Sequence, residues 1–154
     1  DSGSSITLTY NHPIKALFWI NYKDVSTSTY TTAKLQLNGH DRFTEQTDRY
    51  FKLVQPYESG LATHGKSMNI TTLSDLRRYG KLSGGNPTIN YPTTSMYSFA
   101  LKPGEHQPSG TCNFSRIDNA RLILNGATGN TDVFAINYNV LRVMSGMGGL
   151  TYSN

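Results

Sequence analysis

The sequence predicts an all-β protein, an eight-stranded antiparallel jelly-roll sandwich, and three observations support this prediction. Short apolar-rich stretches alternate with turn-forming dipeptides along most of the chain. Only 16% of the residues are charged, whereas Ser, Thr and Asn occur 15, 18 and 13 times and suit strands with polar outer faces. Ten Tyr residues add large contact areas with a hydrogen-bonding tip. The length of 154 residues fits a single domain, residues 1–154.

Eight segments are predicted as strands, because each is rich in β-branched or aromatic residues and is bounded by turn signals. In chain order they are Ile6–Tyr10, Ile14–Asn21, Ala33–Leu37, Tyr50–Gln55, Met96–Leu101, Thr111–Ser115, Ala120–Leu124 and Val133–Met144. Dipeptides that tolerate a positive φ, such as Asn38-Gly39 and Asn125-Gly126, lie between them. Eight is the number of strands in a jelly roll.

The last of these segments has a mixed pattern. Phe134, Ile136, Tyr138 and Val140 alternate with small or polar residues, which favours a strand over a helix. The apolar set changes parity at Leu141, which indicates a bulge or burial of both faces.

One motif matches a nucleotide-binding pattern. The segment GLATHGKS at Gly60–Ser67 fits the phosphate-loop consensus GxxxxGK[ST], in which Lys66 would reach the phosphates and Ser67 would hold magnesium. That site requires a parallel sheet with crossover helices. Here only Thr72–Tyr79 looks helical, for at most about two turns. We therefore interpret the motif as part of a surface loop and keep a phosphate-loop NTPase as the enzyme alternative.

The histidines and the cysteine show no pattern of a metal or catalytic site. His12, His40, His64 and His106 lie far apart without ligand spacing. Cys112 is the only cysteine, so it forms no internal disulfide, and its strand context indicates a small buried side chain. The sequence therefore predicts no catalytic residue, no metal and no cofactor, and a protein that is not an enzyme.

The glycine-rich segment Gly146–Gly149 resembles a fragment of a dinucleotide-binding motif. It lacks the following helix that would present its N-terminus to a phosphate, so close backbone packing is the better interpretation. Of two glycosylation sequons, Asn69 lies in a predicted loop and is the candidate site, whereas Asn113 lies in a predicted strand.

The charge pattern argues against direct nucleic-acid binding. The net charge of +4 is modest and the basic residues are scattered, with Arg77-Arg78 the only adjacent pair. The longest purely apolar run, Ala16–Ile20, is far shorter than a membrane span. We expect no direct nucleic-acid contact and no membrane-spanning segment.

Five segments carry a resemblance to a known family. They are LNGHDRF at Leu37–Phe43, YFKLVQPY at Tyr50–Tyr57, YSFALKP at Tyr97–Pro103, HQPSGTCNFSRIDNA at His106–Ala120 and AINYNVLRVMSGMGGLTYSN at Ala135–Asn154. In this order they resemble the C-terminal jelly roll of the major capsid proteins of nucleocytoplasmic large DNA viruses, the group that includes phycodnaviruses, iridoviruses and mimivirus. The resemblance extends from about His12 to the last residue.

The resemblance implies a structural protein of the virion capsid. Proteins of this family carry two successive jelly rolls, and three chains form a pseudo-hexameric capsomer that tiles an icosahedral shell over an internal membrane. This sequence would be the second half of a double jelly roll, with a long inserted surface loop at residues 58–95. The expected partners are further copies of the chain, as a homotrimer and in neighbouring capsomers, and minor capsid proteins. The expected place of assembly is the host cytoplasm.

The largest apolar side chains of the predicted strands are expected to dominate the core or the packing between sheets. They are Phe18, Trp19, Ile20, Phe51, Phe99, Leu122, Ile136, Tyr138, Val140 and Leu141. A carbohydrate-binding jelly-roll module is the alternative function, since exposed Tyr and Asn side chains could stack on sugars and hydrogen-bond to them.

Overall fold

The computed structural model describes residues 3–22, 30–61 and 94–151. Their strands are β1 (Gly3–Thr7), β2 (Pro13–Tyr22), β3 (Thr32–Leu37), β4 (His40–Asp41), β5 (Gln46–Thr47), β6 (Thr94–Ser98), β7 (Cys112–Asn113), β8 (Ala120–Asn125), β9 (Asn130–Asn137), β10 (Leu141–Met144) and β11 (Met147–Leu150). Every strand pair within this part of the chain is antiparallel, which confirms the predicted antiparallel all-β fold.

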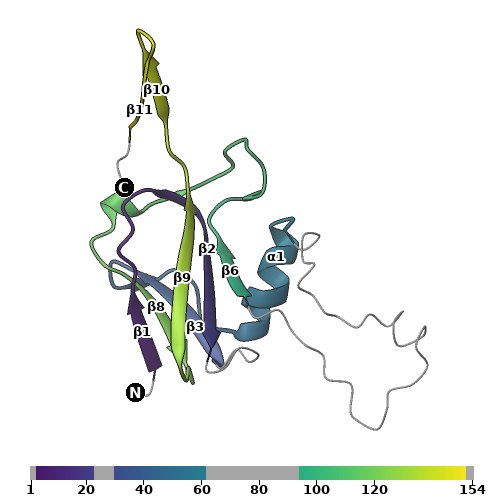
Figure 1. Cartoon of the computed structure of the whole chain (residues 1–154). Helices are drawn as coiled ribbons and strands as arrows, with labels where there is room; N and C mark the ends of the chain where they lie inside the picture. The colour runs from purple at the N-terminus through teal and green to yellow at the C-terminus, as the bar shows by residue number, and fades with distance from the viewer. Residues whose placement is uncertain (1–2, 23–29, 62–93, 152–154) are drawn as a thin grey trace, which may run out of the picture.

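The strands form two larger sheets and one separate hairpin (Figure 1). The first sheet has the order β1-β8-β3-β4, and β5 also pairs with β3. The second sheet has the order β6-β2-β7, and β9 pairs with β2. The hairpin consists of β10 and β11 and extends beyond the two sheets at the end opposite the start of β1 (Figure 1).

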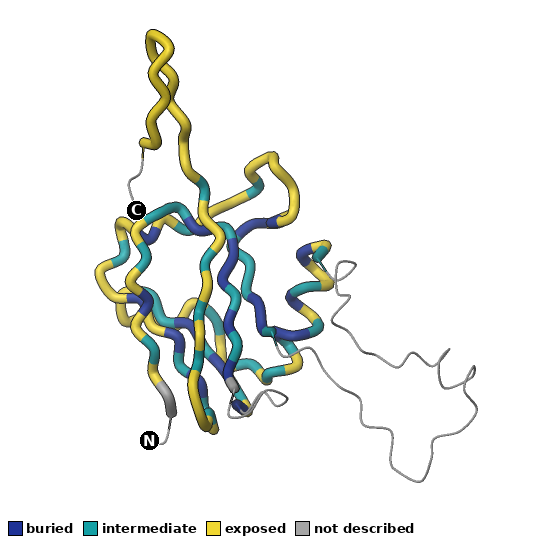
Figure 2. Tube along the Cα trace, viewed as in Figure 1, coloured by how far each residue is buried: buried dark blue, intermediate teal, exposed yellow. Residues whose placement is uncertain are grey.

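Buried side chains from both larger sheets form one core. Alternate residues of β3 and β8 point inward, and β2 contributes from the other side. The residues are Ala33 and Leu35 of β3, Ala120, Leu122 and Leu124 of β8, and Ile14, Leu17 and Trp19 of β2. Buried positions follow these strands, whereas the hairpin is exposed along its length (Figure 2).

A bulge in β2 lets both halves of this long strand reach the core. The register of β2 against β9 shifts between Ile14 and Ala16, so that Lys15 is an additional residue in β2. Ile14 and Leu17 are three residues apart, yet the bulge lets both contribute to the core. The backbone carbonyl of Lys15 accepts a hydrogen bond from the N–H of Phe99 at 2.9 Å.

The prediction of a strand at Tyr50–Gln55 is wrong. The segment forms a π-helical turn, Tyr50–Val54, followed by the short helix α1, Gln55–Glu58. The buried side chains of Phe51 and Gln55 are four residues apart, which is the spacing of one helical face. The pattern within so short a segment fits both periods, and packing of Phe51 against the sandwich decides for the helix.

Four other predicted strands have different bounds in the structure. Ile6–Tyr10 overlaps β1 only in its first two residues, and Met96–Leu101 overlaps β6 only in its first three. The segment Val133–Met144 is divided into β9 and β10, which are separate strands in separate sheets. The segment Thr111–Ser115 contains only the short β7, followed by a 3-10 turn at Phe114–Arg116. The predicted helix Thr72–Tyr79 lies outside the described residues, as does most of the predicted loop at 58–95.

The residues predicted to form the core differ in how far they are buried. Trp19, Phe51 and Leu122 are buried, and Phe99 packs against the core at its edge. Phe18, Ile20 and Tyr138 are partly buried. Ile136, Val140 and Leu141 are 45%, 52% and 67% exposed, so the expectation of burial is wrong for these three. Ile136 lies on the outer face of the second sheet, and the other two lie at the start of the hairpin.

A buried pair of hydroxyl groups lies next to the starts of β3 and β6. The hydroxyl groups of Tyr30 and Ser95 share a hydrogen bond of 2.5 Å, and both residues are buried. The ammonium group of Lys52 lies 5.4 Å from the centre of the Tyr30 ring and forms an ion pair with Asp48 at 3.0 Å. Burial raises the pKa of Tyr30 to about 12.

This pKa predicts a loss of stability in alkaline solution. Because the folded pKa lies above the ordinary value of 10.0, the contribution of Tyr30 is fully present below pH 10.0 and is lost as the pH rises toward about 12. The shift corresponds to roughly 2–3 kcal/mol. Urea unfolding measured across this pH range should show a smaller decline for Tyr30→Phe than for the unchanged protein. An equal decline in both proteins would contradict the assignment to Tyr30.

Candidate assembly surface

The described residues hold no group of three His, Cys, Asp or Glu side chains that could bind a metal ion. His12, His40 and His106 belong to this part of the chain, and His64 does not. Of the phosphate-loop motif Gly60–Ser67, only Gly60 and Leu61 are described, directly after α1. No helix in the described part of the chain is long and apolar enough to cross a membrane.

Cys112 and Asn113 lie in β7. The Cys112 side chain is partly buried, and burial raises the pKa of its thiol, which disfavours the reactive thiolate. The exposed Asn113 side chain accepts a hydrogen bond from the backbone N–H of Ser115 at 3.1 Å and so caps the 3-10 turn. Asn69, the candidate glycosylation site, lies outside the described residues.

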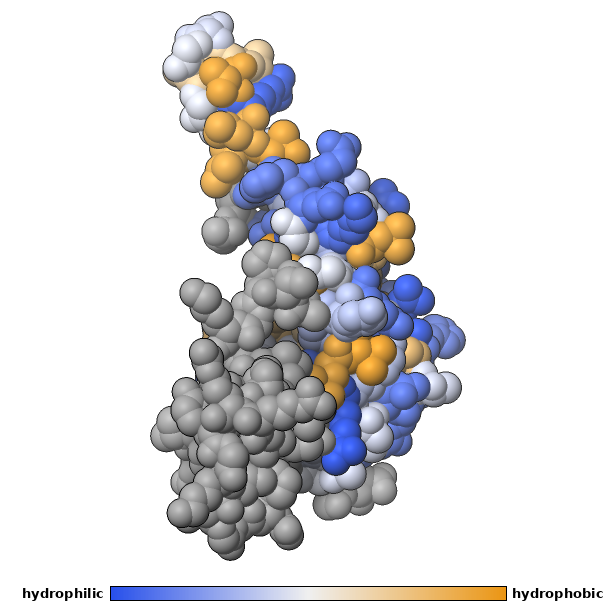
Figure 3. Space-filling model, turned by 90° about the vertical axis from the view of Figure 1, so that its right-hand side faces the viewer, coloured by the Kyte–Doolittle hydropathy of each residue, from blue (hydrophilic) through white to orange (hydrophobic). Residues whose placement is uncertain are grey.

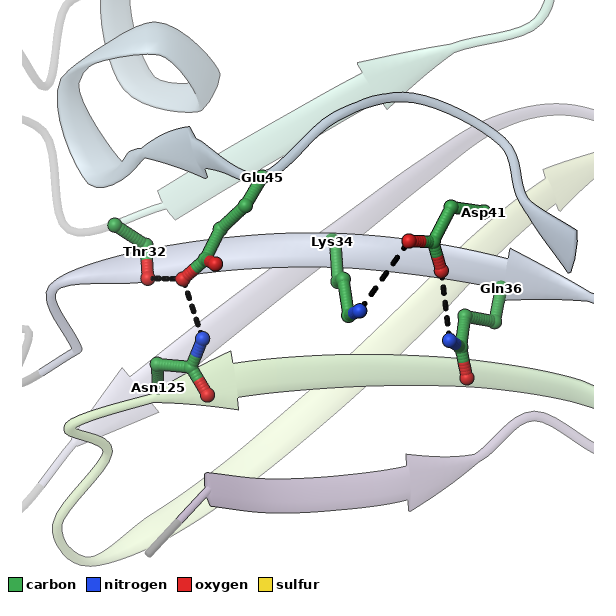
Figure 4. A network of polar contacts seen from close by, with 6 residues as sticks. All are labelled: Thr32, Lys34, Gln36, Asp41, Glu45 and Asn125. Carbon is green, nitrogen blue, oxygen red and sulfur yellow. Dashed lines mark hydrogen bonds and ion pairs between the residues drawn. The ribbon is translucent and has the colours of Figure 1, made fainter. Parts of the chain in front are cut away.

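The outer face of the first sheet is polar (Figure 4). Asp41 accepts hydrogen bonds from Gln36 at 2.6 Å and from Lys34 at 3.3 Å, and these contacts lower the pKa of its carboxyl group. Lys34 and Gln36 are alternate residues of β3, and the side chain of Leu35 between them points into the core.

Glu45 extends this polar face by linking two strands. Its carboxylate accepts hydrogen bonds from Thr32 of β3 and from Asn125 of β8 (Figure 4). The bond from Thr32 is the main reason why the pKa of Glu45 is lowered. Charged and hydrogen-bonded groups therefore lie along β3 and at the end of β8 on this face, and these groups suit contact with water.

The outer face of the second sheet is apolar by comparison. Phe134 of β9 lies opposite Phe18 of β2, and Ile136 lies opposite Ala16. Phe134 is 57% exposed and Ile136 is 45% exposed. Exposed apolar side chains that lie next to each other mark surfaces that contact other molecules. We call Phe18, Phe134 and Ile136 the β9 patch.

The hairpin carries the largest concentration of exposed apolar side chains in the described residues. We call Leu141–Leu150 the hairpin arm. Its large apolar residues are between 55% and 75% exposed, and they are Leu141, Val143, Met144, Met147 and Leu150. Figure 3 shows apolar residues gathered on the arm at the top of the view. Within the part of the chain that is described, β10 and β11 pack chiefly against each other.

The sequence contains a signal for this arm that its apolar residues obscure. Ser145 and Gly146 have φ values of 51° and 78°, the left-handed conformation of a tight two-residue hairpin turn. The Ser-Gly dipeptide, with apolar residues on both sides, could have indicated a hairpin that pairs the end of the predicted strand, at Met144, with the residues after the turn.

Comparisons with known proteins identify one family. The model of the large eukaryotic DNA virus major capsid protein matches residues 85–149. The chain is 50% identical to the major capsid protein of Pyramimonas orientalis virus, over 99% of this chain and 40% of that protein. It is 35% identical to the major capsid protein of Paramecium bursaria Chlorella virus 1, over 99% of this chain and 44% of that protein.

The fold agrees with solved capsid structures. A chain in the quasi-atomic model of the PBCV-1 virus capsid superposes with a TM-score of 0.70 at 30% identity, over 99% of this chain and 46% of that chain. The Faustovirus major capsid protein, at 9% identity and a TM-score of 0.52 over 89% of this chain and 32% of that chain, shares the fold alone. The chain thus spans less than half the length of these relatives.

Proposed function

We propose a structural role in a viral shell, from the premise that this chain belongs to the major capsid protein family of large eukaryotic DNA viruses. In this proposal it is one jelly-roll domain, the second of a double jelly roll, and three copies of the complete polypeptide form a pseudo-hexameric capsomer. The observation that carries the proposal is the 50% identity to a viral major capsid protein over 99% of the chain.

The surface supports association with other protein molecules. Interface cores are depleted of charged residues and enriched in aromatic residues and Met. The β9 patch and the hairpin arm have this composition. Together they present the partly buried Phe18 and seven exposed large apolar side chains of the described residues: Phe134, Ile136, Leu141, Val143, Met144, Met147 and Leu150. A shell subunit needs such surfaces and needs no catalytic group.

The wider arrangement is part of the same proposal and rests on the family resemblance. Copies of the capsomer contact one another and minor capsid proteins, over an internal membrane, and the shell assembles in the host cytoplasm. No observation favours the carbohydrate-binding alternative, since the relatives described above are capsid proteins.

Mass spectrometry of purified virus particles tests the function. After detergent has removed lipids from particles of the virus that encodes this chain, its peptides should be among the most abundant in the remaining shell. Capsomers released from the shell should be trimers with a hexagonal outline in electron micrographs. Particles whose shells lack these peptides would contradict a capsid role, and binding of the monomeric chain to a glycan array would favour the carbohydrate alternative.

A further inference from the structure

We propose that the hairpin arm, Leu141–Leu150, is a docking segment that inserts against a second copy of this chain. The inference rests on the proposed function and adds to it the surface through which copies meet.

The arm is apolar along one face and carries two methionines beside one arginine on the other. In the register of β10 and β11, Leu141 lies opposite Leu150, and Met144 lies opposite Met147. Because side chains alternate along a strand, the leucine pair and Val143 share one face, while the methionine pair and the exposed Arg142 project from the other. A two-stranded hairpin alone is marginally stable in water, and this one exposes apolar groups on both sides. An arm with this pattern gains stability when another protein surface covers the face of Leu141, Val143 and Leu150.

Two glycines in β11 have no explanation within the arm itself. Neither Gly148 nor Gly149 has the positive φ that favours glycine. A Cβ atom at Gly148 would meet only Leu141, at an ordinary 3.9 Å, and a Cβ atom at Gly149 would meet nothing within 4 Å. Glycine inside a strand lowers the stability of a protein relative to alanine, because glycine loses more conformational freedom on folding. Such glycines mark places where another backbone approaches closely, which points to a partner on the arm.

The place of the arm favours a second copy over another part of the same polypeptide. The arm extends from the end of the sandwich opposite the start of β1 (Figure 1). A segment that precedes β1 in a longer polypeptide therefore enters at the far end of the molecule. A neighbouring copy can approach the projecting arm directly, and chains related to this one occur together in a virus capsid.

Sedimentation velocity of purified variants tests the docking. The unchanged chain should self-associate as its concentration rises. Gly149→Val adds a side chain where the chain itself leaves open space, so the thermal unfolding temperature should stay the same or rise, whereas self-association should weaken by about tenfold or more. Leu141→Ser should weaken self-association similarly. The matched control is Leu101→Ser, at another exposed leucine outside the arm, and it should associate like the unchanged chain.

Hydrogen exchange identifies which molecule covers the arm. Amides of residues 141–150 should become protected as the unchanged chain associates, and not in Gly149→Val. A chain that stays monomeric, or arm variants that associate like the unchanged chain, would overturn the inference. So would protection of the arm within a monomer of the longer polypeptide, because that result places the chain's own additional domain on it. The capsid role fails on a different result, the absence of these peptides from the viral shell.

Discussion

Trp19→Ala should lower the free energy of unfolding by about 3–5 kcal/mol, as expected for removal of a large buried aromatic side chain. Trp19 is only 1% exposed and lies in β2, the central strand of the second sheet. Its ring is tilted against that of Phe51, with centroids 5.1 Å apart. Domains are typically stable by only about 5–15 kcal/mol, so this loss would remove a large share of the stability of the protein. Urea unfolding followed by circular dichroism measures the change.

Phe134→Ala is the matched control for this substitution. It removes an aromatic ring from the same sheet, but from the exposed outer face. The expected change for the isolated chain is below about 1 kcal/mol, because most of this ring is already in water. If Trp19→Ala melts cooperatively at nearly the same urea concentration as this control, Trp19 does not have the central packing role described for it.

Phe51→Ala should also lower the free energy of unfolding by about 3–5 kcal/mol. Phe51 is fully buried and joins the helical segment to the sandwich through an aromatic cluster. Its ring centroid lies 5.1 Å from that of Trp19, 5.2 Å from that of Tyr50 and 5.5 Å from that of Phe43. Loss of the ring therefore removes contacts to a strand, a loop and the helical turn together. Thermal and urea unfolding measure the loss.

Val54→Ala provides the comparison within the same helical turn. Val54 is exposed, and alanine has the higher helix propensity, so the expected change is close to zero. A loss for Phe51→Ala no larger than that for Val54→Ala would show that the helical segment is not anchored through Phe51.

The sequence predicts the strands of the sandwich well where one face is buried and the other meets water. β3 and β8 alternate between buried and polar positions, and their predicted ranges agree closely with the observed ones. Burial of Phe51 was also predicted, but as part of a strand. Its segment is too short for the helical and strand periods to be distinguished, and tertiary packing decides between them.

The hairpin arm illustrates a different limit. Leu141 and its neighbours are as apolar as core residues, because a surface that another protein molecule covers uses the same side chains as an interior. Sequence periodicity reports that a face avoids water, and it does not report whether the same chain or another molecule covers that face. The exposed position of Ile136 on β9 has the same explanation.

The difference between the two broad faces of the sandwich constrains how a shell can be built. In the proposed shell, a subunit inserted back to front would place the carboxylates of Asp41 and Glu45, in place of Phe134 and Ile136, against its neighbour. Burial of these carboxylates costs hydration that their hydrogen bonds within the chain offset only in part, so an inverted subunit would be held more weakly than a correctly oriented one. If the chain assembles as proposed, the two-sided sandwich would let wrongly oriented subunits leave while the lattice grows.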